Sequence, residues 1–271
     1  MPPAVCSTTM RRWRDRRVGT VKFDVLTLFP ELFEAFRRVG VLGRAVEKGL
    51  VSIDLHDLRR WSGNRWGQVD DEPYGGGAGM VLKAPPVLDA VREIASEGEI
   101  SPVTIVLSPR GRLLDQAFAE ELRQSGRLLL LCGRYEGFDE RVSEILQPVE
   151  LSLGDFILGG GEVPAMAVIE AVSRLVPGVV GDPESVAEDS FSNQLLDYPC
   201  FTRPAEVEGR SVPEVLRSGN HGKIRRWRVE RAIEATVTRR PDVIKKNWET
   251  YPAEIRRLIR RYDPDLAESL E

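Results

Sequence analysis

The chain has 271 residues, 42% of them hydrophobic, and 38 Lys and Arg against 42 Asp and Glu give a formal net charge of −4. This length predicts about two domains. Two histidines are too few for a multi-histidine metal site, and no apolar run approaches the ~18 residues of a membrane helix. Three scattered cysteines without a CxxC motif indicate a reducing cytoplasm and not a disulfide scaffold.

The net charge conceals an uneven distribution along the chain. Residues 210–261 carry twelve Arg, three Lys and six acidic residues, a net +9, whereas residues 21–209 carry −13. An acidic body joined to a basic C-terminal region favours an anionic partner bound at one end. Arg-rich, solvated helix faces give the same sums without any partner, so charge leaves both interpretations open.

The first part of the chain predicts a short α/β pattern behind an N-terminal extension. Residues 1–20 are Arg-rich and lack the apolar core of a signal peptide, so we expect a disordered extension. Strands are predicted at 22–28 and 51–58, around a helix at 41–48. The polar, Gly-rich stretch 59–80 is too long for an ordinary connection, and long loops of this kind tend to be functional.

The alternation of helices and strands continues and then gives way to helices. Helices are predicted at 86–97, 114–123, 138–146, 163–175 and 221–239, and strands at 103–107, 127–132 and 149–151. Near-continuous apolar strands between helices are typical of a parallel α/β sheet. We therefore expect an α/β domain over 21–180, a flexible linker over 181–193 and a small helical domain over 194–271.

Gly-rich loops follow three successive predicted strands, at 108–112, 132–141 and 152–162. Open parallel sheets bind ligands at the carboxyl ends of their strands, and glycine lets the main chain approach a ligand closely. The GxGxxG and GxxxxGK[ST] fingerprints are absent, which supports neither a dinucleotide site nor a P-loop. Ordinary turns also use glycine, but three such loops with Arg, Glu, Asp and Tyr beside the glycines favour a ligand site.

Four further features deserve a separate interpretation. His56 ends an alternating strand and is expected to be a structural histidine with a satisfied hydrogen bond. His221 precedes a helix, where a hydrogen-bonding or nucleic-acid contact fits. Trp227 lies among arginines and either stacks on a base or packs in the core. The loop 74–80 lacks the Lys and hydroxyl of a P-loop, so a flexible lid or a subunit contact is the better interpretation.

Several motifs occur in a fixed order: FPELF, DDEPYGGGAGM, LSPRGR, GRYEGFDER, LSLGDFILGGGE, SRLVPGV, EDSF and SGNHGKIRRWR. From Lys22 to its end, the chain resembles the bacterial tRNA (guanine-N1)-methyltransferase family of the SPOUT class. The resemblance implies a parallel α/β domain with a C-terminal trefoil knot, a helical tRNA-binding domain, and a cytoplasmic homodimer. It also implies methyl transfer from S-adenosylmethionine to N1 of guanine 37, beside the anticodon of tRNA.

The resemblance assigns two catalytic residues, and the chemistry suits them. Guanine N1 carries a proton at neutral pH, so methylation needs a base, and negative charge grows on O6 as the proton leaves. Matching EDSF, Asp189 is the expected general base. Matching SRLVPGV, Arg174 is expected to stabilise the charge on O6.

Cofactor and tRNA residues also follow from the matching motifs. The expected S-adenosylmethionine residues are Leu107, Ser108, Pro109, Gly133, Arg134, Tyr135, Glu136, Leu153, Gly154, Asp155, Phe156, Ile157, Leu158, Gly160 and Gly161. Glu136 is also expected to take part in a Mg²⁺ requirement, and Phe156 stands where the family often has Tyr. The expected tRNA contacts are Ser190, Ser218, Asn220, His221, Lys223, Arg225 and Arg226.

Two alternatives remain open. One is a SPOUT methyltransferase that modifies ribosomal RNA or a ribose 2′-OH, although ribose methylation creates no charge on guanine O6 for Arg174 to stabilise. The other is a non-catalytic RNA-binding protein with the same fold, against which the acid, the Arg and the glycine loops argue.

Overall fold

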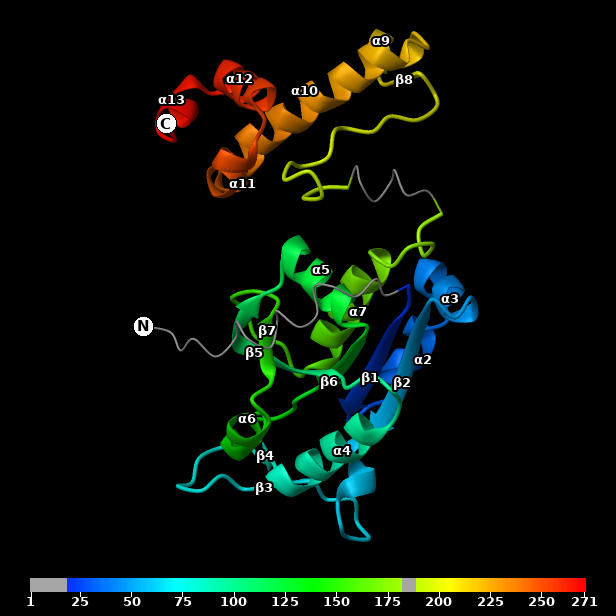
Figure 1. Ribbon diagram of the computed structural model, residues 1–271, viewed down its shortest axis with the longest axis vertical. Helices are drawn as coiled ribbons and strands as arrows, with labels where there is room; N and C mark the ends of the chain where they lie inside the picture. The colour runs from blue at the N-terminus through cyan, green and yellow to red at the C-terminus, as the bar shows by residue number, and fades with distance from the viewer. Residues whose placement is uncertain (1–18, 182–188) are drawn as a thin grey trace. The chain divides into compact units, whose positions relative to one another are not determined.

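The computed structural model describes residues 19–181 and 189–271, and the chain divides into two compact units, Met1–Pro183 and Glu184–Glu271. The first unit holds a five-stranded sheet of order β2-β1-β6-β5-β7 in which every paired strand is parallel (Figure 1). The strands are β1 (Val21–Thr27), β2 (Val51–Asp57), β5 (Val103–Leu113), β6 (Arg127–Leu131) and β7 (Val149–Ser152). The predicted parallel α/β fold is confirmed.

Two hydrophobic cores lie on opposite faces of this sheet, and β6 contributes to both. Leu128 and Leu130 pack with one set of helices, whereas Leu129 and Leu131 pack with the other, and all four are fully buried. The first set is α2 (Leu32–Phe36), α3 (Gly40–Glu47), α5 (Gln116–Ser125) and α7 (Glu162–Arg174); the second is α4 (Ala84–Ser96) and α6 (Glu140–Leu146). Burial of both faces explains why β6 is a continuous apolar run.

The third predicted strand is longer than expected, because β5 continues through the segment that the sequence predicted to be a loop. Its register against β7 shifts between Leu107 and Arg112, which both lie opposite Leu151, so residues 108–111 bulge out of the ladder. A Cβ on Gly111 would lie 2.3 Å from the backbone nitrogen of Leu151. Contact with β7 therefore determines this extension.

The Gly-rich stretch 59–80 also contains regular structure. The 3-10 helix η1 (Leu58–Trp61) opens it, and β3 (Asp70–Asp71) pairs antiparallel with β4 (Val81–Leu82). Pairing of residues 70–71 with residues 81–82 thus closes a loop over residues 72–80, in the second half of the predicted loop.

The second unit consists mainly of helices, as predicted. They are α9 (Glu214–Arg217), α10 (His221–Arg239), α11 (Pro241–Asn247), α12 (Ala253–Tyr262) and α13 (Pro264–Glu268), with the 3-10 helix η2 (Trp248–Thr250) and a hairpin of β8 (Glu206–Val207) and β9 (Arg210–Ser211). Ile233, Ile244 and Ile259 form the centre of its core. In the described ranges, no helix is long and apolar enough to cross a membrane.

Two expectations fall partly outside the described residues. The N-terminal extension predicted over 1–20 is described only from residue 19, and the linker predicted over 181–193 is not described over 182–188. These expectations remain untested.

A buried charged network joins the three adjacent strands β2, β1 and β6. Asp24 on β1 is fully buried, lies 3.0 Å from His56 Nε2 and accepts a 2.8 Å hydrogen bond from Arg127. Lys22 Nζ lies 3.5 Å from the same carboxylate. Burial alone raises the pKa of Asp24, but the hydrogen bonds with His56 and Arg127 and the nearby positive charges outweigh it and hold the pKa below its usual value. The structural role predicted for His56 is confirmed.

Replacing Asp24 by Asn should destabilise the protein, because the buried Arg127 loses its counter-charge. We expect a loss of about 3 kcal/mol in the free energy of unfolding at pH 7, measured by urea denaturation. The lowered pKa of Asp24 stabilises the fold above the ordinary carboxyl pKa of about 4, and this stabilisation disappears as the pH falls through the folded pKa. Wild-type stability should therefore fall more steeply in acid than that of Asp24→Asn.

The control is Asp54→Asn, since this carboxylate is 52% exposed and pairs with Lys22 at the surface. Its loss should cost less than about 1 kcal/mol. Equal effects of the two substitutions would contradict the role given to the buried network.

Candidate functional site

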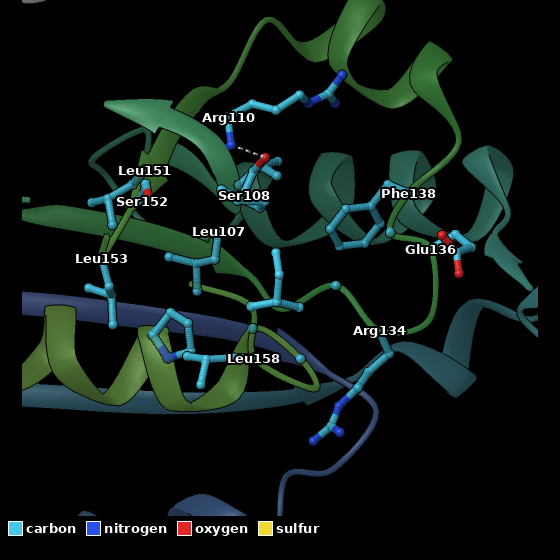
Figure 2. A pocket seen from close by; sticks show the side chains of 18 of the residues that line it. Leu107, Ser108, Arg110, Arg134, Glu136, Phe138, Leu151, Ser152, Leu153 and Leu158 are labelled. Carbon is cyan, nitrogen blue, oxygen red and sulfur yellow. Dashed lines mark hydrogen bonds between the residues drawn. The ribbon is translucent and has the colours of Figure 1, made fainter. Parts of the chain in front are cut away.

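A cavity of about 500 Å³ lies at the carboxyl edge of the sheet, beside the bulge in β5 and the ends of β6 and β7. Figure 2 shows its wall from close by. It is formed by the β5 bulge, the segment that follows β6 and the glycine turn that follows β7. These are the three Gly-rich segments that the sequence singled out.

Fourteen of the fifteen residues predicted to bind the cofactor line this cavity, and Asp155 does not. Other residues also line it: Val106, Arg110, Gly137, Phe138, Glu140, Ser143, Leu151, Ser152, Gly159 and Pro164. Glu140 and Ser143 lie three residues apart in α6, on one helix face. The helical spacing of Glu140 and Ser143, at the start of α6, could have indicated from the sequence that both face the cavity.

The β5 bulge forms one wall and is tied to the neighbouring elements by charged contacts. Ser108 Oγ accepts a 3.2 Å hydrogen bond from the backbone nitrogen of Arg110. The Arg110 guanidinium lies 3.3 Å from Glu140 and 3.8 Å from Glu150. The side chain of Arg110 thus links the bulge to α6 and β7 in the present conformation.

The segment after β6 forms the second wall and contacts the loop 74–80. Glu136 donates its backbone N–H to the carbonyl of Met80 (3.0 Å), and Leu82 donates to the carbonyl of Gly137 (2.9 Å). The end of that loop is therefore fixed beside the cavity wall, while the predicted lid or subunit-contact role of its tip remains untested.

The glycine turn after β7 contacts the segment after β6 through the main chain. Gly161 donates its N–H to the carbonyl of Gly133 (2.9 Å), and a Cβ on Gly161 would lie 2.6 Å from the Cα of Cys132. Any larger residue would push the two segments apart. Burial, helped by the charge of Glu162, raises the pKa of the Cys132 thiol well above its usual value, so the thiol stays neutral.

The cavity combines apolar side chains with exposed main chain. Leu107, Leu153 and Leu158 supply apolar surface, and the glycines leave backbone N–H and C=O groups accessible. Cavities of this size and composition bind compact organic ligands and orient them with a few polar groups. The donor set fits a nucleoside-sized ligand that is recognised largely by main-chain groups.

The two predicted catalytic residues belong to different units of the chain. Arg174 is the last residue of α7 and is exposed, whereas Asp189 is half-buried in the second unit. The backbone carbonyl of Asp189 accepts a hydrogen bond from Ser192 (3.1 Å), and Ser190 Oγ accepts one from the backbone of Asp197 (2.9 Å). Their joint action therefore remains a prediction.

Six of the seven residues predicted to contact tRNA lie at or just before the start of α10, whereas Ser190 lies apart from them and accepts a hydrogen bond from Asp197. Asn220 caps this helix by accepting a hydrogen bond from the backbone nitrogen of Lys223 (3.0 Å), and Ser218 Oγ accepts one from Asn220 (3.2 Å). His221, Lys223, Arg225 and Arg226 are exposed on the first turns. Trp227 is half-buried, with its ring centroid 6.3 Å from that of Phe201, which agrees with packing.

The fold and this site define a class: an α/β protein with a nucleoside-sized cavity at the carboxyl edge of its sheet and a helical second unit whose residues 210–261 are basic. A family model described as tRNA (Guanine-1)-methyltransferase TrmD matches residues 21–246. The chain belongs to this family, whose members use S-adenosylmethionine.

Curated relatives carry the name tRNA (guanine-N(1)-)-methyltransferase. A protein of Rhodopirellula baltica is 46% identical over 241 residues, which cover 88% of this chain and 100% of the relative. A protein of Chloroflexus aurantiacus is 51% identical over 226 residues, covering 83% and 89% of the two chains. One from Geobacter metallireducens is 50% identical over 226 residues, covering 83% and 92%.

Gly161→Ala should weaken binding of S-adenosylmethionine by about tenfold. The added methyl group would lie 2.6 Å from the Cα of Cys132, so the glycine turn has to move away from the segment after β6 and the ligand is no longer held in the same position. Isothermal titration calorimetry measures the dissociation constant. Gly181→Ala is the matched control, since a Cβ there meets nothing within 4 Å. Unchanged affinity in a folded Gly161→Ala protein would contradict the assignment of this turn to the ligand site.

Proposed function

We propose that this chain transfers a methyl group from S-adenosylmethionine to N1 of the guanine at tRNA position 37, next to the anticodon. The observation that carries the proposal is the cavity at the carboxyl edge, which is lined by the family's motif residues. When bound, S-adenosylmethionine supplies a methyl group made electrophilic by the positive charge on its sulfur.

The three segments around the cavity would hold the methyl donor. Gly133, Tyr135 and Leu158 line the cavity and would contact polar atoms of the donor through their main chain, and Leu107 and Leu153 would offer apolar surface for a flat ring.

Asp189 and Arg174 would act on the guanine. The Asp189 carboxylate accepts the N1 proton, and the N1 electron pair forms the bond to the methyl carbon as the carbon–sulfur bond breaks. The electrons of that bond stay on sulfur. Arg174 lies at the end of α7 and would stabilise the negative charge that develops on O6.

The tRNA would be bound through its phosphates by the basic start of α10. His221, Lys223, Arg225 and Arg226 are exposed there, and phosphate contacts position a nucleic acid without reading its sequence. Ser190 lies beside the proposed base, and Ser218 and Asn220 would act chiefly by building the start of the helix.

A trefoil knot and a homodimer are further parts of the proposal. The knot rests on the resemblance to the SPOUT class, since the close approach of Gly111 to the backbone of Leu151 is a contact between two paired neighbouring strands. Phe156, Ile157 and Val163, which lie in or next to the glycine turn, expose 54%, 82% and 58% of their surface, and burial in a dimer would remove this apolar area from water. The scattered cysteines favour a reducing cytoplasm.

The expected Mg²⁺ requirement has weaker support. In ranges 19–181 and 189–271, no group of three or more His, Cys, Asp or Glu side chains is arranged to hold a metal ion. The described side chains therefore do not form a protein-built site around Glu136, and no step of the proposed reaction uses the ion.

The test is methyl transfer from labelled S-adenosylmethionine to tRNA transcripts that differ only in G or A at position 37. We expect label in the G37 transcript alone, and nuclease digestion should yield 1-methylguanosine. Equal labelling of both transcripts would favour another RNA target, and labelling of neither would contradict the proposed activity.

Asp189→Ala should abolish transfer in this assay, because the N1 proton then has no acceptor. Calorimetry should find S-adenosylmethionine bound as in the wild type, since the cavity lies in the other unit of the chain. A near-wild-type rate in this variant would assign the base to a different group.

A further inference from the structure

The buried carboxylate of Glu162 lies next to the glycine turn, close to Gly160. Glu162, the first residue of α7, is 1% exposed. Thr27 at the end of β1 donates its hydroxyl to Glu162 Oε1 (2.8 Å), and Arg134 Nε lies 2.9 Å from Glu162 Oε2. The three side chains come from the end of β1, from the segment that follows β6 and from the start of α7, so they join three separate segments of the first unit.

The Arg134 guanidinium is engaged by the protein on several sides. Arg134 Nη1 donates to the carbonyl of Gly159 (3.0 Å), and its Cζ lies 4.7 Å from the centroid of the Phe29 ring. Figure 2 shows the side chain directed away from Glu136 and Phe138. The guanidinium therefore links segments of the protein, while the main chain of Arg134 remains beside the cavity.

The side chains of Arg134 and Glu162 pack tightly against the glycine turn. A Cβ on Gly160 would lie 2.3 Å from Arg134 Nε and 2.6 Å from Glu162 Oε2. In the described part of the chain, neither of these two atoms makes a hydrogen bond, although they lie 2.9 Å apart. The buried charge of Glu162 is thus compensated chiefly by Arg134, and a buried carboxylate without its partner is strongly unfavourable.

We propose that Thr27, Glu162 and Arg134 form a clamp that positions the turn Gly159–Gly161 for binding of the methyl donor, with Glu162 as its central positioning residue. The proposal rests on the proposed function, because it takes S-adenosylmethionine as the ligand of the cavity. In this clamp, Arg134 donates a hydrogen bond to the carbonyl of Gly159, and the ion pair with Glu162 holds the Arg134 side chain in place. Misplacement of a binding segment by about 1 Å is enough to weaken a site substantially.

Glu162→Ala tests the clamp. Arg134, whose side chain is 26% exposed, is then free to turn into solvent and release Gly159. We expect the dissociation constant for S-adenosylmethionine, measured by calorimetry on the full chain, to rise by about tenfold. The KM for S-adenosylmethionine should rise in parallel, while kcat at saturating donor and the KM for tRNA change little.

The matched control is Arg123→Ala, which removes an ion pair with Glu120 on α5, where neither residue lines the cavity. It should leave the affinity for S-adenosylmethionine unchanged. Thr27→Val and Thr27→Ser form a second pair, because serine keeps the hydroxyl that Glu162 accepts and valine does not. We expect Thr27→Val to weaken binding and Thr27→Ser to restore it.

A folded Glu162→Ala protein with wild-type affinity would overturn the clamp. If Glu162→Ala fails to fold, the Thr27 pair decides: equal affinities for the valine and serine variants would overturn it, and weaker binding by valine alone would support it. A wild-type protein that does not bind S-adenosylmethionine would contradict the proposed function itself, and the clamp with it.

Discussion

At two places on the carboxyl edge of the sheet, a glycine packs directly against the backbone of a neighbouring segment, and the shape of the cavity depends on both contacts. Gly111 lies against the backbone of Leu151, and Gly161 lies against the backbone of Cys132. A side chain at either glycine would overlap backbone atoms that have nowhere to move. The consequence is a cavity whose walls are largely peptide groups, which suits a ligand recognised by backbone hydrogen bonds and shape.

Two buried charged networks hold the sheet around this edge. Asp24, with His56 and Arg127, joins β2, β1 and β6 inside the sheet, whereas Glu162, with Thr27 and Arg134, joins the ends of β1 and β6 to α7. Such networks favour one arrangement of the strands, because any other leaves a charge buried without its partner. Pairing of buried charges thus stabilises the sheet around Asp24 and, in our proposal, positions the ligand site around Glu162.

Local pattern predicted the elements whose formation depends on their own residues. The apolar run of β6 and the bounds of α10 agree with the prediction, since a continuous apolar strand and a capped helix carry their signals in the sequence. The extension of β5 to Leu113 could not be predicted, because it depends on pairing with Leu151 far along the chain. The burial of Glu162 could not be predicted either. An acidic residue at the start of a helix usually faces solvent, and the partners of Glu162, Thr27 and Arg134, lie far from it in the sequence.

The candidate site shows the same division. The glycine loops identified the cavity edge from the sequence, because parallel strands bring their carboxyl ends together. Pattern alone selected neither Asp189 among the acidic residues near it nor Arg174; both rest on the matching motifs. The two residues belong to separate units, so neither unit by itself brings together the pair that the proposed reaction uses.

Hydrogen–deuterium exchange of the full chain, with and without S-adenosylmethionine, tests the central claim most directly. If the three segments at the carboxyl edge bind the methyl donor, amide exchange should slow in peptides that cover 107–112, 133–138 and 153–161, and the hairpin of β8 and β9 should exchange as before. Bound S-adenosylmethionine with no protection in these three segments would contradict the account.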